Sequence, residues 1–373
     1  MPSLNDFLNE KLSLRKEQGL IRNLTTTRLA VDFFSNDYLG LSRSEELSHS
    51  IEKLHRALGV KNGSTGSRLL GGNTNYTEQV ERDLSAVFKS EASLIFNSGY
   101  AANLAVLSAI PQKGDTIIYD SLAHASLKDG ARLSLATRHS FHHNDLGDLE
   151  RKLRVSKGKK FIVMESVYSM DGDICPLNEI TKLADTYDAC IILDEAHSTG
   201  VMGPLGAGYC VDQDLHDKVD IRIYTFGKGM GVHGACVAGS QTLIQYLINF
   251  ARPFIYTTAL SQHQVVSIQC AFAFLASHIT LQQALKHKVA LYLEGAAKLP
   301  NRTASVSAIQ TVLCSGNERV RQMAQTLQGK GFDVRPILSP TVPQGSERLR
   351  ICLHTFNTEE NIRGLTEMLT SLL

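Results

Sequence analysis

The segment Cys190-Ile191-Ile192-Leu193-Asp194-Glu195-Ala196-His197 has the pattern of a buried strand that ends in two acidic residues. Short apolar runs of the same kind recur through the middle of the chain and alternate with helical patterns. They lie at residues 93–96, 116–119, 161–164, 190–193, 221–226 and 236–238. Such alternation is typical of βαβ units around a mostly parallel sheet. The sequence therefore predicts an α/β fold with one large domain over residues 42–277.

Two further segments flank the predicted large domain. Residues 1–41 hold an amphipathic stretch over 4–17 and an alternating, strand-like run over 29–34, which together predict an N-terminal arm. A helical pattern over 281–299, followed by strand-like pieces and a final helix, predicts a smaller α+β C-terminal domain over 278–373. The length of 373 residues fits this division, because a single hydrophobic core stops growing at about 250 to 300 residues.

The composition is that of a folded protein without a strong overall charge. Hydrophobic residues make up 43% of the chain and charged residues 20%, which is unlike a disordered chain. Lys and Arg number 38 against 37 Asp and Glu, so the net charge of +1 gives no general attraction for nucleic acid. The seven cysteines are widely spaced and form no CxxC pair, which predicts reduced core thiols in a cytoplasmic protein. The apolar runs are too short to predict a membrane span or a signal peptide.

Lys228 stands out because it follows a predicted strand and is enclosed by Gly227, Gly229 and Gly231. Removing an amine from water lowers its pKa and makes it a better nucleophile for forming an imine. The alternative is a solvated turn lysine beside flexible glycines.

Asp194 lies at the carboxyl end of a strand, where ligands bind in open α/β sheets. Its carboxylate could pair with a pyridinium N–H, cap a helix or form a core salt bridge.

Two more segments could serve a phosphorylated ring. In the segment 96–103 a strand passes through Ser98 and Gly99 into a helix, whose first N–H groups and dipole favour a phosphate. His124 lies in a strand-to-helix loop, where it could stack on an aromatic ring or merely cap a helix or face solvent.

Two other interpretations fail on their spacing. Residues 194–197 spell a helicase box, but the chain has no GxxxxGK[ST] loop to hold a nucleotide. His139, His142 and His143 form a cluster without carboxylate or Cys partners at ligand spacing, so no metal site is predicted there.

Taken together, these segments resemble the α-oxoamine synthases, pyridoxal phosphate (PLP) enzymes of the fold-type-I aminotransferase group. The resemblance covers nearly the whole chain through blocks that occur in the family's order: 35–41, 63–72, 98–103, 121–126, 169–173, 194–200, 225–231 and 340–350. It implies a large PLP domain with a mostly parallel sheet, a smaller C-terminal lobe and an N-terminal arm. It also implies a homodimer with shared active sites.

The resemblance implies a role for each matching residue. Lys228 would form the imine with PLP, Asp194 would pair with the pyridine nitrogen, and His124 would stack on the ring. The other implied cofactor contacts are Ser98, Gly99, Tyr100, Ser169, His197, Thr225 and, from across the dimer interface, Thr257 or Thr258. The implied substrate-binding residues are Arg22, Asn36, Thr341 and Arg350.

The implied reaction is a decarboxylative condensation of an L-amino acid with an acyl thioester. The tail 336–345, the block 35–41 and the length most resemble the members that join alanine to a pimeloyl thioester, on coenzyme A or a carrier protein. Those members make 8-amino-7-oxononanoate, CO2 and a free thiol in biotin biosynthesis. The alternatives are glycine C-acetyltransferase, 5-aminolevulinate synthase and serine palmitoyltransferase. A catalytically silent partner subunit is a further alternative, but such subunits lack the imine lysine that is present here as Lys228.

Overall fold

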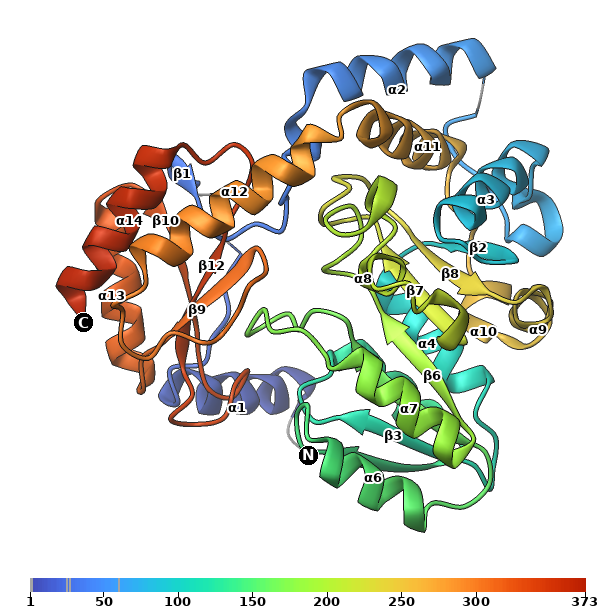
Figure 1. Cartoon of the computed structure of the whole chain (residues 1–373), viewed down its shortest axis with the longest axis horizontal. Helices are drawn as coiled ribbons and strands as arrows, with labels where there is room; N and C mark the ends of the chain where they lie inside the picture. Colours follow the sequence, from blue (N-terminus) through green and yellow to red (C-terminus); the bar gives the residue numbers. More distant parts are fainter. Residues whose placement is uncertain (1–2, 25, 27, 60) are drawn as a thin grey trace.

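A seven-stranded sheet forms the centre of the protein, whose structure is a computed structural model (Figure 1). The structure describes residues 3–24, 26, 28–59 and 61–373, so part of the predicted arm, residues 1–2, 25 and 27, lies outside the described residues. The strands are β2 (Ala92–Phe96), β3 (Thr116–Asp120), β4 (Thr137–Phe141), β5 (Lys160–Glu165), β6 (Ala189–Asp194), β7 (Ile221–Thr225) and β8 (Ala235–Gly239).

The strand order is β2-β8-β7-β6-β5-β3-β4. Strands β4, β3, β5, β6 and β7 pair in parallel, whereas β8 is antiparallel to both β7 and β2. The predicted α/β fold with a mostly parallel sheet is confirmed. The six predicted strands lie within one residue of the observed bounds at each end.

Helices cover both faces of this sheet. Alternate strand residues point to opposite sides, so apolar side chains on both faces have to be buried. Ile192 of β6 belongs to the core on the side of α4 (Gly99–Ala109), α5 (Ala125–Leu133) and α9 (Gln241–Phe250). Ile191 and Leu193 belong to the core on the side of α6 (Leu146–Val155) and α7 (Leu177–Tyr187). Strand β6 is therefore buried on both faces, which explains its continuous apolar run. Further helices of this part are α3 (Asn75–Val87), α8 (Tyr209–Asp212), α10 (Arg252–Ile255) and α11 (Gln262–Ser277).

A second, antiparallel sheet has the order β11-β12-β9. Its strands are β9 (Ile309–Leu313), β11 (Arg335–Ile337) and β12 (Arg348–Cys352), and the helices near it are α12 (Thr280–Gly295), α13 (Asn317–Gly329) and α14 (Glu359–Leu372). Figure 1 shows these elements together on one side of the molecule, reached from α11 through α12. They supply the helices and strands expected of the C-terminal α+β domain, while the boundaries 1–41, 42–277 and 278–373 stay predictions.

The N-terminal segment forms less regular structure than its pattern predicts. The amphipathic stretch is the helix α1 (Leu4–Glu17), but none of its residues is buried. The strand-like run over 29–34 gives only β1 (Val31–Asp32), which pairs in parallel with β10 (Phe332–Asp333). The next helix, α2 (Glu45–Leu58), packs against α11. The helix α1 and the strand β1 thus make few contacts, whereas Phe33, Tyr38 and Leu41 anchor the end of the segment in the main hydrophobic core.

One strand and one helix end differ from the sequence-based expectation. The strand β4 was not predicted, because four of its five side chains are exposed and its sequence Thr-Arg-His-Ser-Phe has a single buried apolar residue. The helix predicted over 281–299 begins at Thr280 and ends at Gly295.

In the described ranges no single helix is both long and apolar enough to cross a membrane; α11 and α12 meet the length and composition test only as a pair, bent by 75°.

A buried ion pair network fixes the loop that follows β3. The Asp120 carboxylate accepts the N–H groups of Leu122 (2.8 Å) and Asn144 (3.0 Å) and lies 2.9 Å from His143 Nδ1. His143 Nε2 lies 2.7 Å from Asp173. Burial alone would lower the pKa of His143, but the hydrogen bonds and charges of the two carboxylates raise it to about 10. Among the described residues no group of three or more His, Cys, Asp or Glu side chains could hold a metal ion.

We expect the stability of the protein to fall as the pH rises from 6.5 to 10, and His143→Gln to weaken this dependence. The folded protein keeps the His143 proton up to about pH 10, whereas the unfolded chain releases it above 6.5. At 1.36 kcal/mol per pKa unit, the contribution of the His143 proton to the free energy of unfolding has an upper limit of roughly 5 kcal/mol. Denaturant unfolding at several pH values measures it, with the exposed His139→Gln as the control. Equal pH slopes for wild type and His143→Gln would contradict the prediction.

Candidate active site

The predicted site residues gather at the carboxyl ends of the parallel strands. Asp194 ends β6, and Glu165 pairs with it at the end of β5. Lys228 follows β7 by three residues. This edge is where open α/β sheets bind ligands. The Asp194 side chain is 4% exposed, and its carboxylate accepts hydrogen bonds from Asn103 Nδ2 (2.7 Å) and the N–H of Ala196 (2.9 Å).

A chain of hydrogen bonds connects Lys228 with the predicted substrate-binding residues. Lys228 Nζ lies 2.8 Å from His197 Nε2, and His197 Nδ1 lies 2.7 Å from the Tyr38 hydroxyl. Asn36 Oδ1 accepts hydrogen bonds from Tyr38 (3.1 Å) and from Arg350 Nη2 (2.9 Å). The structure thus brings Asn36, His197, Lys228 and Arg350 into one network.

The charges of this network depend on its burial. Burial lowers the pKa of Lys228, although the charges of Asp194 and Glu165 act in the opposite direction. Burial, together with the charges of Lys228 and Arg350, lowers the pKa of His197 well below its usual range. His197 is therefore a neutral imidazole beside an amine that loses its proton more readily than an exposed lysine.

A second hydrogen-bonded chain leads from Asp194 to His124. Asn103 Nδ2 also donates to Ser126 Oγ (2.9 Å), which lies 2.7 Å from His124 Nδ1. His124 precedes α5, its ring is exposed, and its N–H donates to the Glu165 carboxylate (2.6 Å). Burial and the charge of Asp194 raise the pKa of Glu165 to about 8. His124 is thus held through both its ring and its backbone, while the residue stays exposed.

Ser98, Gly99 and Thr225 form a close cradle at the start of α4. Ser98 Oγ accepts the N–H of Ala101 (3.2 Å) and caps the helix. A Cβ atom on Gly99 would lie 2.2 Å from Thr225 Oγ1, so only glycine fits there. The N–H groups of a first helical turn have no partners within the helix and attract anions. The Tyr100 hydroxyl donates to Asp129 of α5. A buried carboxylate, an amine of lowered pKa and this cradle form a donor set that fits PLP.

The remaining substrate residues lie on two sides of the network. Arg350 Nε donates to the Ser169 carbonyl oxygen (2.6 Å). Thr341 lines a cavity of about 300 Å³ together with His124 and Ser169. Arg22 Nη2 lies 3.4 Å from Thr341 Oγ1. These contacts place all four predicted substrate residues in or beside the site, while their roles stay predictions.

Thr257 and Thr258 lie beside the segment that leads to the cradle. Asn97 Nδ2 donates to Thr257 Oγ1 (3.2 Å) and to the carbonyl oxygen of Thr258 (2.9 Å). Because Asn97 directly precedes Ser98, the two threonines are near the start of α4 of their own chain. Their predicted contact with a phosphate across a dimer interface stays a prediction.

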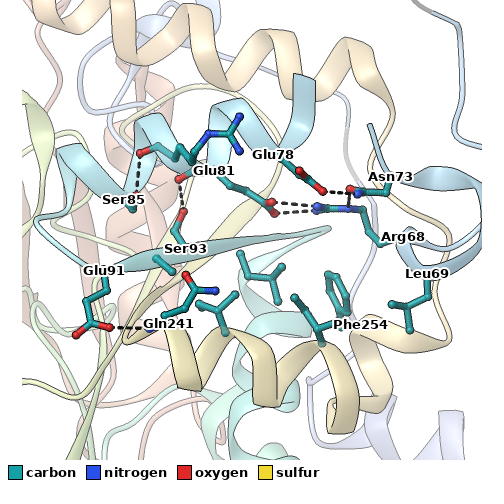
Figure 2. Close-up of a pocket in the computed structure, with 15 residues that line it drawn as sticks. Arg68, Leu69, Asn73, Glu78, Glu81, Ser85, Glu91, Ser93, Gln241 and Phe254 are labelled. Carbon is teal, nitrogen blue, oxygen red and sulfur yellow. Dashed lines mark hydrogen bonds and ion pairs between the residues drawn. The ribbon is translucent and has the colours of Figure 1, made fainter. Parts of the chain in front are cut away.

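Another cavity, of about 280 Å³, lies beside the edge strand β2 and contains none of the predicted site residues (Figure 2). In Figure 2 the Arg68 guanidinium points directly at Glu81, and both its Nη atoms donate to that carboxylate, at 2.7 and 2.9 Å. Glu81 also accepts the N–H of Ile95 (2.8 Å). Arg68 and Glu81 thus pair with each other, and Glu81 also binds the edge of the sheet.

Comparison with known proteins assigns the family. The family described as "Aminotransferase class I and II" matches residues 30–369. The chain belongs to this family. An 8-amino-7-oxononanoate synthase of Emericella nidulans is 38% identical, covering 99% of this chain and 96% of the relative. An 8-amino-7-oxononanoate synthase of Cellvibrio japonicus is 35% identical, covering 100% of this chain and 97% of the relative.

Solved structures of family members agree with this assignment. A serine palmitoyltransferase from S. paucimobilis, with a bound PLP-myriocin aldimine, has a TM-score of 0.88 at 26% identity, covering 98% of this chain and 96% of that one. The 8-amino-7-oxononanoate synthase from Francisella tularensis has a TM-score of 0.79 at 28% identity, and the match covers 91% of this chain and 97% of that one. The resemblance to the α-oxoamine synthases and the fold-type-I architecture are confirmed. This aminotransferase-family chain is therefore an enzyme of the PLP-dependent, acyl-transferring kind.

Four residues of the site were missed from the sequence: Tyr38, Asn103, Ser126 and Glu165. Three of them lie inside blocks that carry the family resemblance, the exception being Glu165, which ends a predicted strand as Asp194 does. A polar residue at the end of a buried strand was therefore an available signal for Glu165. The other three act through contacts with distant residues, which local sequence patterns do not show.

We expect Gly99→Ala to weaken PLP binding at least about tenfold, or about 1.4 kcal/mol, because the new Cβ atom displaces Thr225 Oγ1 from the cradle. Titration of the protein with PLP, followed by absorbance, measures the affinity. The control is Gly329→Ala in α13, where a Cβ atom meets nothing within 4 Å. In the double variant Gly99→Ala/Thr225→Ala the steric part of the loss should disappear. Unchanged affinity in Gly99→Ala would contradict the tight fit.

Proposed function

We propose that this enzyme binds PLP through Lys228 and condenses L-alanine with a pimeloyl thioester, giving 8-amino-7-oxononanoate, CO2 and a free thiol. The binding of PLP is supported by the convergence of an amine, a buried carboxylate and a glycine cradle at one edge of the sheet. The names of the relatives that match over nearly the full length support the second part.

PLP supplies an aldehyde that condenses with amines and a ring that withdraws electrons from the carbon next to the bound nitrogen. Asp194 would hold a proton on the ring nitrogen, and each pKa unit by which it does so contributes about 1.4 kcal/mol. Asn103 and the N–H of Ala196 fix the direction of its carboxylate. His124 would cover one face of the ring, and the first turn of α4, with Ser98, Gly99 and Thr225, would bind the phosphate.

Lys228 would have two functions that both require a neutral amine. It would hold the cofactor between reactions and, when released, take the proton from the α-carbon of the amino acid. The lowered pKa of Lys228, caused by burial, increases the fraction of neutral amine. Arg350 would bind the carboxylate of the amino acid, since its guanidinium is already held by Asn36 and the Ser169 carbonyl oxygen (2.6 Å) at the far end of the network.

Serine palmitoyltransferase is a second candidate function, and the structural likeness favours it. The TM-score with the enzyme from S. paucimobilis exceeds that with the Francisella tularensis synthase, 0.88 against 0.79. Sequence identity has the opposite order, 26% against 28%, and two relatives at 38% and 35% identity carry the synthase name. We therefore rank the synthase first.

We also infer a homodimer in which Thr257 or Thr258 completes the partner's phosphate site.

The purified wild-type protein should be yellow with PLP and show a visible absorption band that Lys228→Ala lacks. The reason is that the band requires the bond between PLP and the Lys228 amine. The exposed Lys113→Ala is the matched control and should keep the band. A wild type that is colourless after PLP is added and the unbound PLP is removed would contradict the proposed cofactor and exclude a catalytic role for Lys228.

The amino acid and acyl specificity should favour alanine with pimeloyl thioester over the other family pairs. One methyl group distinguishes alanine from glycine, so the expected ratio of kcat/KM is about 10 to 200. Release of free thiol measures turnover with alanine, glycine or serine against pimeloyl, acetyl, succinyl or palmitoyl thioesters. Faster turnover of serine with palmitoyl thioester would favour the second candidate, and faster turnover of glycine with acetyl thioester would contradict both.

A further inference from the structure

We propose that Tyr38 is a positioning residue that keeps His197 in the tautomer with a bare Nε2, so that His197 accepts a hydrogen bond from Lys228 and aims its amine. This inference deepens the proposed function, because it concerns the amine that would bind PLP. It rests on the hydrogen-bonded chain Lys228–His197–Tyr38–Asn36 and on the hydrogen-bonding capacity of each member.

The far end of the chain has a fixed direction. Asn36 Oδ1 can only accept hydrogen bonds, and it lies 3.1 Å from the Tyr38 hydroxyl and 2.9 Å from Arg350 Nη2. We therefore assign the single hydroxyl proton of Tyr38 to Asn36. The Tyr38 oxygen is then left as an acceptor, for His197 Nδ1 at 2.7 Å and for the neighbouring Arg350 guanidinium.

His197 has to supply the next proton. Its side chain is 5% exposed and its pKa is far below the usual range, chiefly because of burial, so the ring is neutral and carries one N–H. In a neutral imidazole the hydrogen bond at one nitrogen decides the state of the other. With the proton on Nδ1 and donated to Tyr38, Nε2 is bare and accepts from Lys228 Nζ at 2.8 Å.

This arrangement gives each hydrogen bond of the chain one donor and one acceptor, whether Lys228 is charged or neutral. In the opposite arrangement Tyr38 would donate to His197, Asn36 would lose the Tyr38 hydroxyl as a donor and keep Arg350 and Cys352, and Nε2–H would need the lone pair of the Lys228 amine. That lone pair is the reactive part of the amine. Tyr38 thus keeps the lone pair available by turning the imidazole's acceptor, and not its donor, toward Lys228.

The hydroxyl of Tyr38 is well placed for this task. Its side chain is 1% exposed, so water cannot readily replace it. The rings of Tyr38 and His197 are tilted at 54° with centroids 6.1 Å apart, so they meet through the hydroxyl and not by stacking. Other charged and titratable groups also act on this amine and imidazole: Asp194 of β6, Glu165 of β5, His124 before α5, and Arg350 and Cys352 of β12. Arg350 and Cys352 also act on the Tyr38 hydroxyl, so Tyr38→Phe changes their surroundings as well.

The expected effect of Tyr38→Phe on Lys228 has a definite sign. Without the acceptor at Nδ1, a buried N–H there would be unpaired, so the ring moves its proton to Nε2 by exchange with solvent. Nε2–H then donates to the neutral amine, which stabilises that form and lowers the pKa of Lys228 by about one unit. At the same time it occupies the lone pair, so the neutral amine reacts about tenfold more slowly.

Competitive labelling with acetic anhydride over a range of pH measures both quantities. The full chain without PLP is labelled, and mass spectrometry compares Lys228 with the exposed Lys113 as an internal reference. We expect Tyr38→Phe to shift the labelling midpoint of Lys228 to lower pH and to reduce the labelling rate above the midpoint. A midpoint and a rate equal to those of the wild type would overturn the proposal.

Tyr292→Phe is the matched control for removing a buried hydroxyl. Tyr292 is fully buried in α12, and within the described part of the chain its hydroxyl has no hydrogen-bond partner. We expect this variant to leave both labelling quantities of Lys228 unchanged. A shift in Tyr292→Phe as large as that in Tyr38→Phe would show a general packing effect and would also overturn the proposal.

A second variant keeps the test decisive if Tyr38→Phe does not fold. Replacement of Tyr38 by 3-fluorotyrosine keeps the shape but makes the hydroxyl a weaker acceptor and a stronger donor. The midpoint should therefore move in the same direction by a smaller amount, and no movement would overturn the proposal.

PLP added to the wild type should protect Lys228 from the label. Loss of this protection alone would contradict the proposed function and leave the role of Tyr38 intact.

Discussion

The burial of the Asp194 carboxylate is the constraint on which the rest of the site depends. A carboxylate removed from water must be paired or hydrogen-bonded, or it takes up a proton. Asn103 and the N–H of Ala196 supply two hydrogen bonds, and the charges of Asp194 and Lys228 act on each other across the site. The neighbouring Glu165 cannot share this support, and its pKa rises to about 8 as a result of burial and the charge of Asp194. The Glu165 carboxyl group therefore keeps its proton at neutral pH.

Close approach of backbone segments is the second requirement, and glycine meets it at two points. Gly99 allows the start of α4 to approach Thr225 at the end of β7, which builds the cradle. Gly231 has φ +65°, and a Cβ atom there would lie 2.3 Å from the N atom of Ser42. The loop that carries Lys228 is therefore docked against the segment that carries Asn36 and Tyr38. The same loop geometry thus serves the lysine and the hydrogen-bonded chain that aims it.

The sequence was sufficient to predict those features that depend on local patterns. The strand ends at Asp194 and before Lys228 follow from apolar runs bounded by polar residues, and the helix start at Ser98 follows from its capping pattern. Strand β4 was missed because edge strands with exposed side chains have no apolar signal. The two-residue strand β1 is defined by its pairing with β10, about three hundred residues away, and a strand-like run alone does not fix such a pairing.

The hydrogen-bonded network could not be predicted for the same reason, since its partners are distant in sequence. Tyr38 and His197 are separated by 159 positions, and Asn36 and Arg350 by 314. Three separate parts of the chain therefore have to be folded before the Lys228 amine is held in its final direction. A local opening of the N-terminal segment would release Asn36 and Tyr38 together, and it would cut the connection between Arg350 and Lys228. Phe33 and Tyr38 are buried in the main hydrophobic core, so packing of this part of the N-terminal segment determines how rigidly the site is organised. This dependence explains why residues with no direct contact to the amine, such as Asn36, can govern its chemistry.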